Sequence, residues 1–208
     1  SVGVAGLALT DGDLTLGTAL TLGAGQAFAV NGTSSLTGSG GANTAFTVNE
    51  AMSGTGALTV SGVDLSVGAA TSTFTGGVAL EAGSTVTTGN GEWLSKLDSL
   101  TLNADATATQ FTYTGNATAT YAGTLISGGT AEATVATSGA GTGALNFTGT
   151  VDGSGDLVFK ALAGSTATTT LAFTSSTFTG TTVIDTMSAA VDTQASVGGA
   201  GMRILDSQ

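Results

Sequence analysis

The chain has 208 residues, of which 41% are hydrophobic and only 8% are charged. It contains no Cys, His or Pro, and its 14 acidic residues against three basic ones give a net charge of −11. Without Cys or His, the common transition-metal ligands and nucleophile–base pairs cannot be built, so we expect no enzymatic activity. The scarcity of bases argues against a nucleic-acid partner, because neutralising phosphates requires Lys and Arg.

The N-terminal run Val2-Gly3-Val4-Ala5-Gly6-Leu7-Ala8-Leu9 is apolar and resembles a strand with no local hairpin partner. The sequence begins with Ser1, and a removed signal peptide, a tag remnant or a trimmed start would each explain this. No apolar run reaches the roughly 18–20 residues of a membrane span, so we expect no membrane span. We expect a secreted protein, extracellular or on a cell surface.

Short runs in which Thr alternates with an apolar residue follow along the whole chain. Examples are Leu14-Thr15-Leu16, Leu58-Thr59-Val60, Leu100-Thr101-Leu102 and Phe111-Thr112-Tyr113. This period of two is typical of half-buried strands, and Thr suits the solvated side because it is β-branched and polar. Gly, Asn, Asp and Ser interrupt the runs roughly every 8–12 residues and predict turns. The chain is therefore predicted to be all-β with many short strands.

One segment departs from this pattern. Trp93, Leu97 and Leu100 are spaced at i, i+4 and i+7, which is a helical period, and Asn90 precedes them as a candidate cap. We predict a short helical turn near residues 92–97 that packs on the β core as an apolar plug.

Internal similarities indicate a repeat. Gly54-Thr55-Gly56-Ala57-Leu58 has counterparts at Gly141-Thr142-Gly143-Ala144-Leu145 and Gly153-Ser154-Gly155-Asp156-Leu157, and Ser72-Thr73-Phe74-Thr75-Gly76 has one at Ser176-Thr177-Phe178-Thr179-Gly180. The matches occur in the same order in both halves. We predict two tandem β units, residues 1–90 and 91–190, followed by a C-terminal tail or strand over residues 191–208.

These segments resemble the β-strand repeat of bacterial autotransporter passengers. In that repeat, Gly-x-Gly-x-Leu precedes an apolar strand and an aromatic-Thr-Gly turn. Gly54 to Leu58 with Phe74 to Gly77, and Gly153 to Leu157 with Phe178 to Val183, carry the resemblance over about 80 residues. Phe stands where the family usually has Tyr, and residues 1–208 include no membrane-barrel module. The resemblance implies a right-handed β-solenoid on a cell surface and transfers no activity.

A β-sandwich or jelly roll fits the strand spacing equally well. Either fold exposes strand edges, which proteins commonly protect with Pro and Lys. This chain has no Pro and only two Lys, so its edges are suited to occupation by neighbours. For such assembly we single out the apolar residues of the two terminal segments: Val2, Val4, Leu7, Leu9, Ile204 and Leu205. An ordinary first strand within its own domain is the alternative for the N-terminal run.

No cofactor is expected, although two acidic turns offer oxygen ligands of the kind that calcium prefers. They are Asp11-Gly12-Asp13 and Asp152-Gly153-Ser154-Gly155-Asp156. Neither has the third carboxylate or the terminal Glu of a full calcium loop, and Asp and Gly are also ordinary turn residues.

The sequence favours a structural subunit of a secreted surface filament, fibre or layer, with further copies of itself as partners. Assembly would proceed by strand addition and apolar contacts. Two alternatives remain open. One is a monomeric adhesin-like module that binds a host or cell-surface glycan or protein, and the other is a viral coat or decoration protein with a jelly-roll fold.

Overall fold

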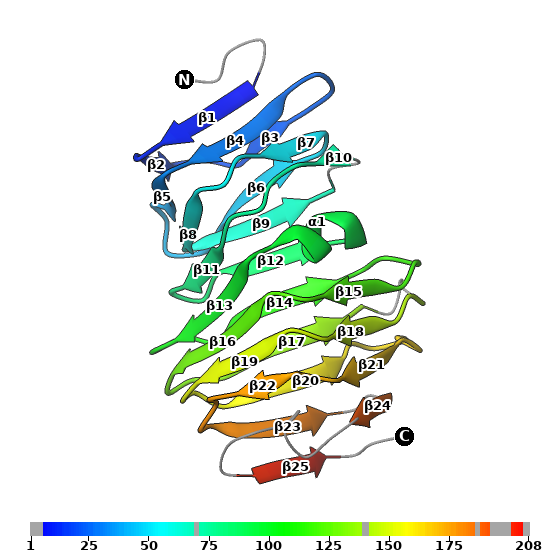
Figure 1. Ribbon diagram of the computed structural model, residues 1–208. Coiled ribbons are helices and arrows are strands. Elements are labelled where there is room, and N and C mark those ends of the chain that lie inside the picture. The colour runs from blue at the N-terminus through cyan, green and yellow to red at the C-terminus, as the bar shows by residue number, and fades with distance from the viewer. Residues whose placement is uncertain (1–5, 69–70, 139–141, 186–187, 192–200, 206–208) are drawn as a thin grey trace.

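The computed structural model describes residues 6–68, 71–138, 142–185, 188–191 and 201–205. In this part the chain is a β-solenoid of about eight turns. The turns are stacked in sequence order, with β1 (Gly6–Thr10) and β25 (Gly201–Leu205) at opposite ends of the stack (Figure 1). The predicted all-β class and its solenoid alternative are confirmed.

Strands of successive turns form four parallel sheets, named here A to D. Sheet A contains β1 (Gly6–Thr10), β4 (Ala27–Asn31), β7 (Ala51–Ser53) and β10 (Thr71–Ser72). Sheet B contains β2 (Asp13–Leu16), β5 (Thr33–Gly38), β8 (Ala57–Ser61), β11 (Val78–Glu81), β13 (Ser99–Ala104), β16 (Thr124–Gly129), β19 (Thr150–Gly153) and β22 (Ser175–Ser176). Sheet C contains β3 (Leu20–Leu22), β6 (Thr44–Val48), β9 (Val63–Val67), β12 (Thr85–Thr88), β14 (Thr109–Tyr113), β17 (Ala133–Thr137), β20 (Leu157–Ala161), β23 (Thr181–Asp185) and β25 (Gly201–Leu205). Sheet D contains β15 (Ala119–Tyr121), β18 (Leu145–Phe147), β21 (Thr168–Leu171) and β24 (Ser188–Val191).

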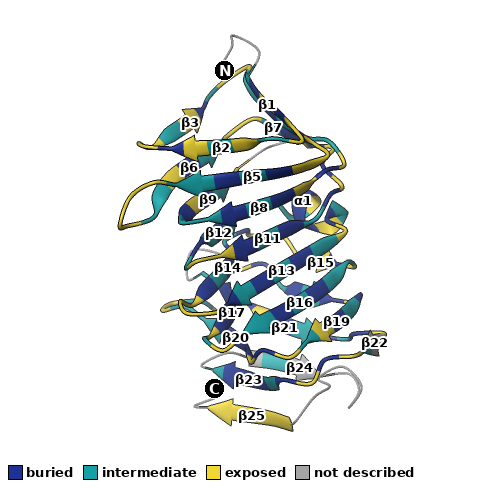
Figure 2. Cartoon of the chain, turned by 90° about the vertical axis from the view of Figure 1, so that its left-hand side faces the viewer, coloured by how far each residue is buried: buried dark blue, intermediate teal, exposed yellow. Residues whose placement is uncertain are grey.

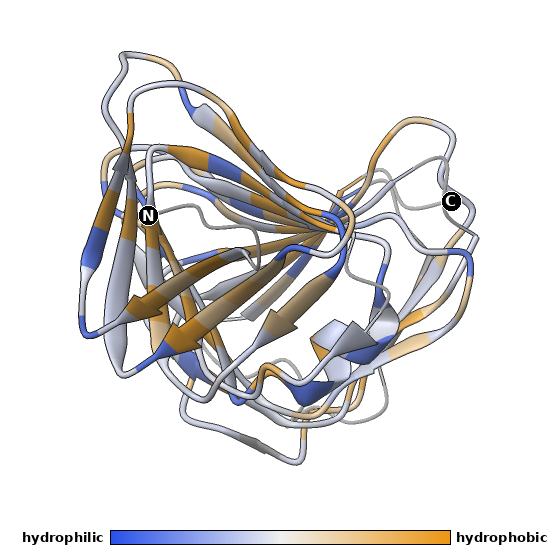
Figure 3. Ribbon diagram, turned by 90° about the horizontal axis from the view of Figure 1, so that it is seen from above, coloured by the Kyte–Doolittle hydropathy of each residue, from blue (hydrophilic) through white to orange (hydrophobic). Residues whose placement is uncertain are grey.

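Each turn of the solenoid contributes one segment to each of three faces around a common interior (Figure 3). Sheets B and C form two complete faces, and sheets A and D share the third. The strand pairings are all parallel among the described residues. The sandwich and jelly-roll alternatives are therefore wrong, because those folds are built from antiparallel sheets.

Inward-facing side chains form columns that run along the solenoid axis, as expected for stacked turns. The longest column belongs to sheet C and consists of Leu20, Phe46, Leu65, Val86, Phe111, Val135, Phe159, Ile184 and Ile204. Its seven inner members are almost completely buried. Figure 2 shows the resulting alternation of buried and more exposed residues along the strands.

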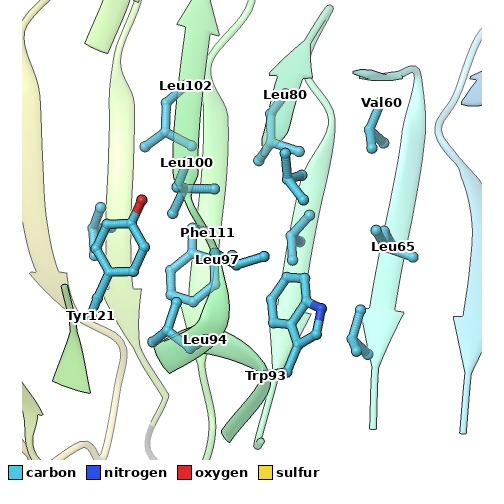
Figure 4. Close-up of a cluster of buried hydrophobic side chains, with 14 of the residues drawn as sticks. Val60, Leu65, Leu80, Trp93, Leu94, Leu97, Leu100, Leu102, Phe111 and Tyr121 are labelled. Atoms are coloured by element: carbon cyan, nitrogen blue, oxygen red, sulfur yellow. The ribbon is translucent and has the colours of Figure 1, made fainter. Parts of the chain in front are cut away.

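Helix α1 (Gly91–Lys96) takes the place of a strand on the third face and separates sheet A from sheet D. The predicted cap is confirmed, because the Asn90 side chain accepts hydrogen bonds from the backbone N–H groups of Glu92 and Trp93. Trp93 is fully buried, and its indole N–H lies 3.2 Å from the Met52 sulfur. The helix thus places a large side chain in the core, as Figure 4 shows. It ends before Leu100, which lies in β13.

The repeated glycine motif marks corners of the solenoid where backbones of successive turns approach closely. A Cβ on Gly56 would lie 2.7 Å from the backbone nitrogen of Gly32, and one on Gly76 would lie 2.8 Å from the carbonyl carbon of Gly56. The same stacking recurs at the second copy, where a Cβ on Gly180 would lie 2.8 Å from the carbonyl carbon of Gly155. Only glycine permits this approach without displacing the neighbouring backbone.

The copies of this motif precede strands of three different sheets: β8 in sheet B, β18 in sheet D and β20 in sheet C. What recurs in these copies is therefore the glycine-rich corner before a strand, and the corner leads to a different face of the solenoid each time. The spacing along the sheet C column also varies, from 19 residues (Phe46 to Leu65) to 26 (Leu20 to Phe46). The predicted division at residue 90 coincides with α1, whereas sheets B and C continue across it.

Candidate assembly surfaces

The C-terminal end of the solenoid exposes apolar side chains that continue the core. β25 pairs with β23, which places Met202 beside Thr182 and Ile204 beside Ile184 in the inward direction. Met202 is 42% exposed and Ile204 is 57% exposed, although their column neighbours are buried. Figure 2 shows β25 as an exposed strand at the end of the stack. Among the described residues, no strand covers the core at this position.

The N-terminal end is more nearly closed. Leu7 and Leu9 of β1 are buried in the core against β4, so their side chains serve this chain's own fold. Val2 and Val4 lie outside the described residues. Leu14 and Leu20 begin the inward columns of sheets B and C, and both are only partly buried. Among the described residues of the first turn, the large apolar side chains that stay partly accessible are therefore those of Leu14 and Leu20.

Sheet edges inside and at the ends of the solenoid differ in their protection. The inner edge of sheet A is β10, where the Lys96 ammonium donates a hydrogen bond of 2.5 Å to the Ser72 carbonyl oxygen. The Glu92 carboxylate forms an ion pair with the same ammonium, with 2.6 Å between Oε1 and Nζ. A Lys at an edge discourages the addition of another strand. At the terminal edges of sheet C, β3 and β25 have a partner on one side only within the described part of the chain.

The outer face of sheet C carries a groove of about 240 Å³ near its C-terminal edge. Val158 and Val183 form its floor, and both are nearly buried although they lie outside the core cluster. Leu205, Asp156 and Arg203 also line it. Leu205, predicted as an assembly residue together with Ile204, consequently faces outward while Ile204 faces inward.

The two acidic turns use their carboxylates to connect successive turns of the solenoid. Asp11 accepts a hydrogen bond from the Thr33 N–H, and Asp13 accepts one from the Ser35 hydroxyl at 2.6 Å. Asp152 accepts hydrogen bonds from the Thr177 hydroxyl and the Gly153 N–H, and these two bonds lower the pKa of its carboxyl group. Among the described residues, no three acidic side chains gather as a metal site would require. The absence of a cofactor stays an expectation, with calcium at these turns as its alternative.

Comparison with protein families, curated proteins and solved structures gives no match for this chain. None of the helices in the described ranges has the length and apolar character needed to cross a membrane. The resemblance to autotransporter repeats therefore stays an expectation, and the functional argument depends on the geometry of the two ends.

Sequence reasoning missed two accessible apolar residues at the N-terminal end, Leu14 and Leu20, whereas Met202 belongs to the C-terminal apolar segment that it singled out. Leu14 and Leu20 lie in Leu-Thr-Leu runs that resemble those of interior strands. The signal that distinguishes them is their place in the first turn, and this place becomes visible only when the turns have been assigned.

Proposed function

We propose that the chain is a structural subunit of a secreted cell-surface filament, fibre or layer, and that it binds further copies of itself. The observation that carries this proposal is the exposure of Met202 and Ile204 at the end of the described core. Soluble proteins rarely leave apolar core rows exposed unless another surface covers them. The unprotected strand edges at β3 and β25 support the same function.

The proposed assembly mechanism is the addition of β-strands together with burial of apolar side chains. A stable interface of this kind generally buries at least about 1,000 Å². The small and hydroxyl-bearing residues on the outside need few ion pairs for solubility, and the net charge of −11 keeps unassembled subunits apart.

The experiment is to concentrate the purified chain at several ionic strengths and to follow it by analytical ultracentrifugation and negative-stain electron microscopy. We expect elongated particles whose length grows with protein concentration. A species that stays monomeric at millimolar concentration at every ionic strength tested would refute the proposed function.

A monomeric adhesin-like module is the second candidate, and the groove on the outer face of sheet C favours it. Its apolar floor beside Arg203 and Asp156 combines contact area with polar groups that orient a ligand. Glycan-array binding that is lost in Val183→Asp while the fold is retained would support this function. The viral coat alternative assumes a jelly-roll fold, and the parallel solenoid is a different fold.

A further inference from the structure

We infer that the corner at Asn31-Gly32 is a site of spontaneous deamidation, where Asn31 of the folded chain is converted to Asp or isoaspartate. The chain has one other Asn-Gly pair, Asn90-Gly91, and the fold protects it. The reaction consumes only water, with hydroxide as the base, and needs no enzyme. The inference does not depend on the proposed self-assembly, because it concerns the chemistry of a single chain.

The reaction joins the Asn side chain to the backbone nitrogen of the next residue. Hydroxide removes the Gly32 amide proton, and the nitrogen then attacks Cγ of Asn31. The new N–Cγ bond closes a succinimide ring, the Cγ–Nδ2 bond breaks, and the side-chain nitrogen takes a proton from water and leaves as ammonia. Water opens the ring at either carbonyl carbon, which gives Asp or isoaspartate. Glycine at the second position favours closure, because no Cβ obstructs the approach.

The Asn31 side chain is available for this attack. Asn31 is the exposed last residue of β4, and the alternation of the strand turns it away from the buried Val30. Gly32 is also exposed and has a φ of +69°, so it lies in the turn between β4 and β5. Within the described ranges, neither the Asn31 carboxamide nor the Gly32 N–H group forms a hydrogen bond. No side-chain hydrogen bond therefore has to break before the ring closes.

Asn90, by contrast, is held by the hydrogen bonds that cap α1. Its Oδ1 accepts from the backbone N–H groups of Glu92 at 2.9 Å and Trp93 at 3.2 Å. Gly91 is the first residue of the helix, and a Cβ there would lie 3.0 Å from the Cβ of Ala119. Turning the Asn90 side chain toward the Gly91 nitrogen breaks both capping bonds, which stabilise the helix. The same dipeptide is thus reactive at one corner and protected at the other.

Conversion of Asn31 changes the contact between the first two turns. It adds one negative charge beside Asp11, whose carboxylate lies against Gly32 and accepts a hydrogen bond from the Thr33 N–H. The isoaspartate product also carries an extra methylene group in the backbone between the Cα of residue 31 and the Gly32 nitrogen. The Asn31 carbonyl oxygen accepts the Asp11 N–H at 3.0 Å, and isoaspartate displaces this acceptor. Modification therefore weakens the hydrogen bonds that join these turns.

Ageing of the purified chain tests the inference. One sample is kept folded in mildly alkaline buffer, and a second is kept in the same buffer with guanidinium chloride. Both are then denatured and cut with chymotrypsin. Cleavage after the aromatic residues Phe28, Phe46, Phe74 and Trp93 places the two Asn-Gly pairs in different peptides, residues 29–46 and 75–93. Tandem mass spectrometry locates the gain of one dalton, and isoaspartyl methyltransferase labelling measures isoaspartate.

In the folded sample, we expect Asn31 to react at least about fivefold faster than Asn90, because the capping bonds must break at Asn90. In the unfolded sample these bonds are absent, so the two rates are expected to agree within about twofold. Comparable rates in the folded sample would overturn the inference, as would an Asn31 that stays intact while the unfolded chain reacts. A difference that persists unchanged after unfolding would overturn the protection of Asn90 by the fold.

Asn31→Gln is the matched control variant, since its side chain is one methylene longer and closes the corresponding ring far more slowly. With an unchanged circular dichroism spectrum, it is expected to lose the mass gain in residues 29–46 and the more acidic fraction that anion exchange separates from the aged chain. A mass gain that persists in this peptide would assign the reaction to Asn43 and overturn the inference. A urea midpoint of the acidic fraction equal to that of the unmodified chain would overturn the weakened contact between turns.

Discussion

Gly54 provides a sharp test of the stacked-corner geometry. It follows β7 with a φ of +105°, in a conformation that residues with a side chain rarely adopt. A Cβ there would lie 2.7 Å from the carbonyl carbon of Val30 in the preceding turn, and closer still to its oxygen. The backbone strain of Gly54→Ala costs about 1–3 kcal/mol, and the steric overlap costs about 1–3 kcal/mol more. We therefore expect Gly54→Ala to lose about 2–6 kcal/mol of stability.

Gly23→Ala is the matched control, because no atom lies within 4 Å of its Cβ position and no positive φ is recorded there. It is expected to be neutral or to stabilise by about 0.4–1 kcal/mol through the unfolded state. Urea denaturation followed by circular dichroism measures both variants. With a slope of about 2 kcal/mol/M, Gly54→Ala lowers the midpoint by roughly 1–3 M. Midpoints that agree for the two variants would refute the close approach of turns at this corner.

Three further predictions concern ionisation, the helix and salt. Burial raises the pKa of both Tyr113 and Tyr121 above the ordinary 10.0, so the folded chain holds protons that the unfolded chain releases. This stabilisation is complete below about pH 10 and is lost as the pH rises further. Absorbance at 295 nm, which measures tyrosinate, is therefore expected to rise only together with loss of the β-sheet circular dichroism signal. Ionisation of the tyrosines near pH 10 in a fully folded chain would contradict this. Asn90→Ala removes the α1 cap and is expected to lower the free energy of unfolding, measured by urea denaturation, by about 1 kcal/mol. The control is Asn116→Ala at an exposed position, which is expected to lower it by less than about 0.5 kcal/mol. An equal loss of stability in both variants would show that the cap contributes nothing specific. Salt screens repulsion between subunits that each carry a charge of −11, so light scattering is expected to show faster assembly as NaCl is raised, and rates independent of salt would refute this role of the charge.

The local elements of this fold are readable from the sequence because each depends on neighbouring residues. Leu14-Thr15-Leu16 and Leu100-Thr101-Leu102 lie in β2 and β13, as their alternation predicts. The helical turn lies at Gly91–Lys96 with the expected Asn90 cap. Strand alternation and helix capping depend on residues only a few positions apart, so tertiary context changes them little.

The choice between solenoid and sandwich was not readable, for a physical reason. Parallel sheets are usually covered on both faces and then consist of nearly continuous apolar residues. Here the outer faces are solvated, so residues such as Thr47 and Thr87 alternate with core residues, as they would in an antiparallel sandwich. The alternation identifies the buried side of each strand. It carries no information about the direction of the neighbouring strand.

The candidate assembly residues show the same limit. Leu9 and Ile204 are both apolar residues near an end of the chain, yet Leu9 is buried and Ile204 is exposed. The difference depends on which turn lies next to each residue, which is a property of long-range stacking. Sequence reasoning therefore selected Ile204, which is exposed, together with Leu7 and Leu9, which are buried in the chain's own core.

Sedimentation of the purified chain tests the central claim, which is that copies of this chain assemble with one another. The exposed apolar side chains of Met202 and Ile204 carry that claim. Analytical ultracentrifugation over a range of protein concentrations is predicted to show species larger than the monomer, and their share is predicted to grow with concentration. Sedimentation as a monomer at every concentration and ionic strength tested would contradict the account.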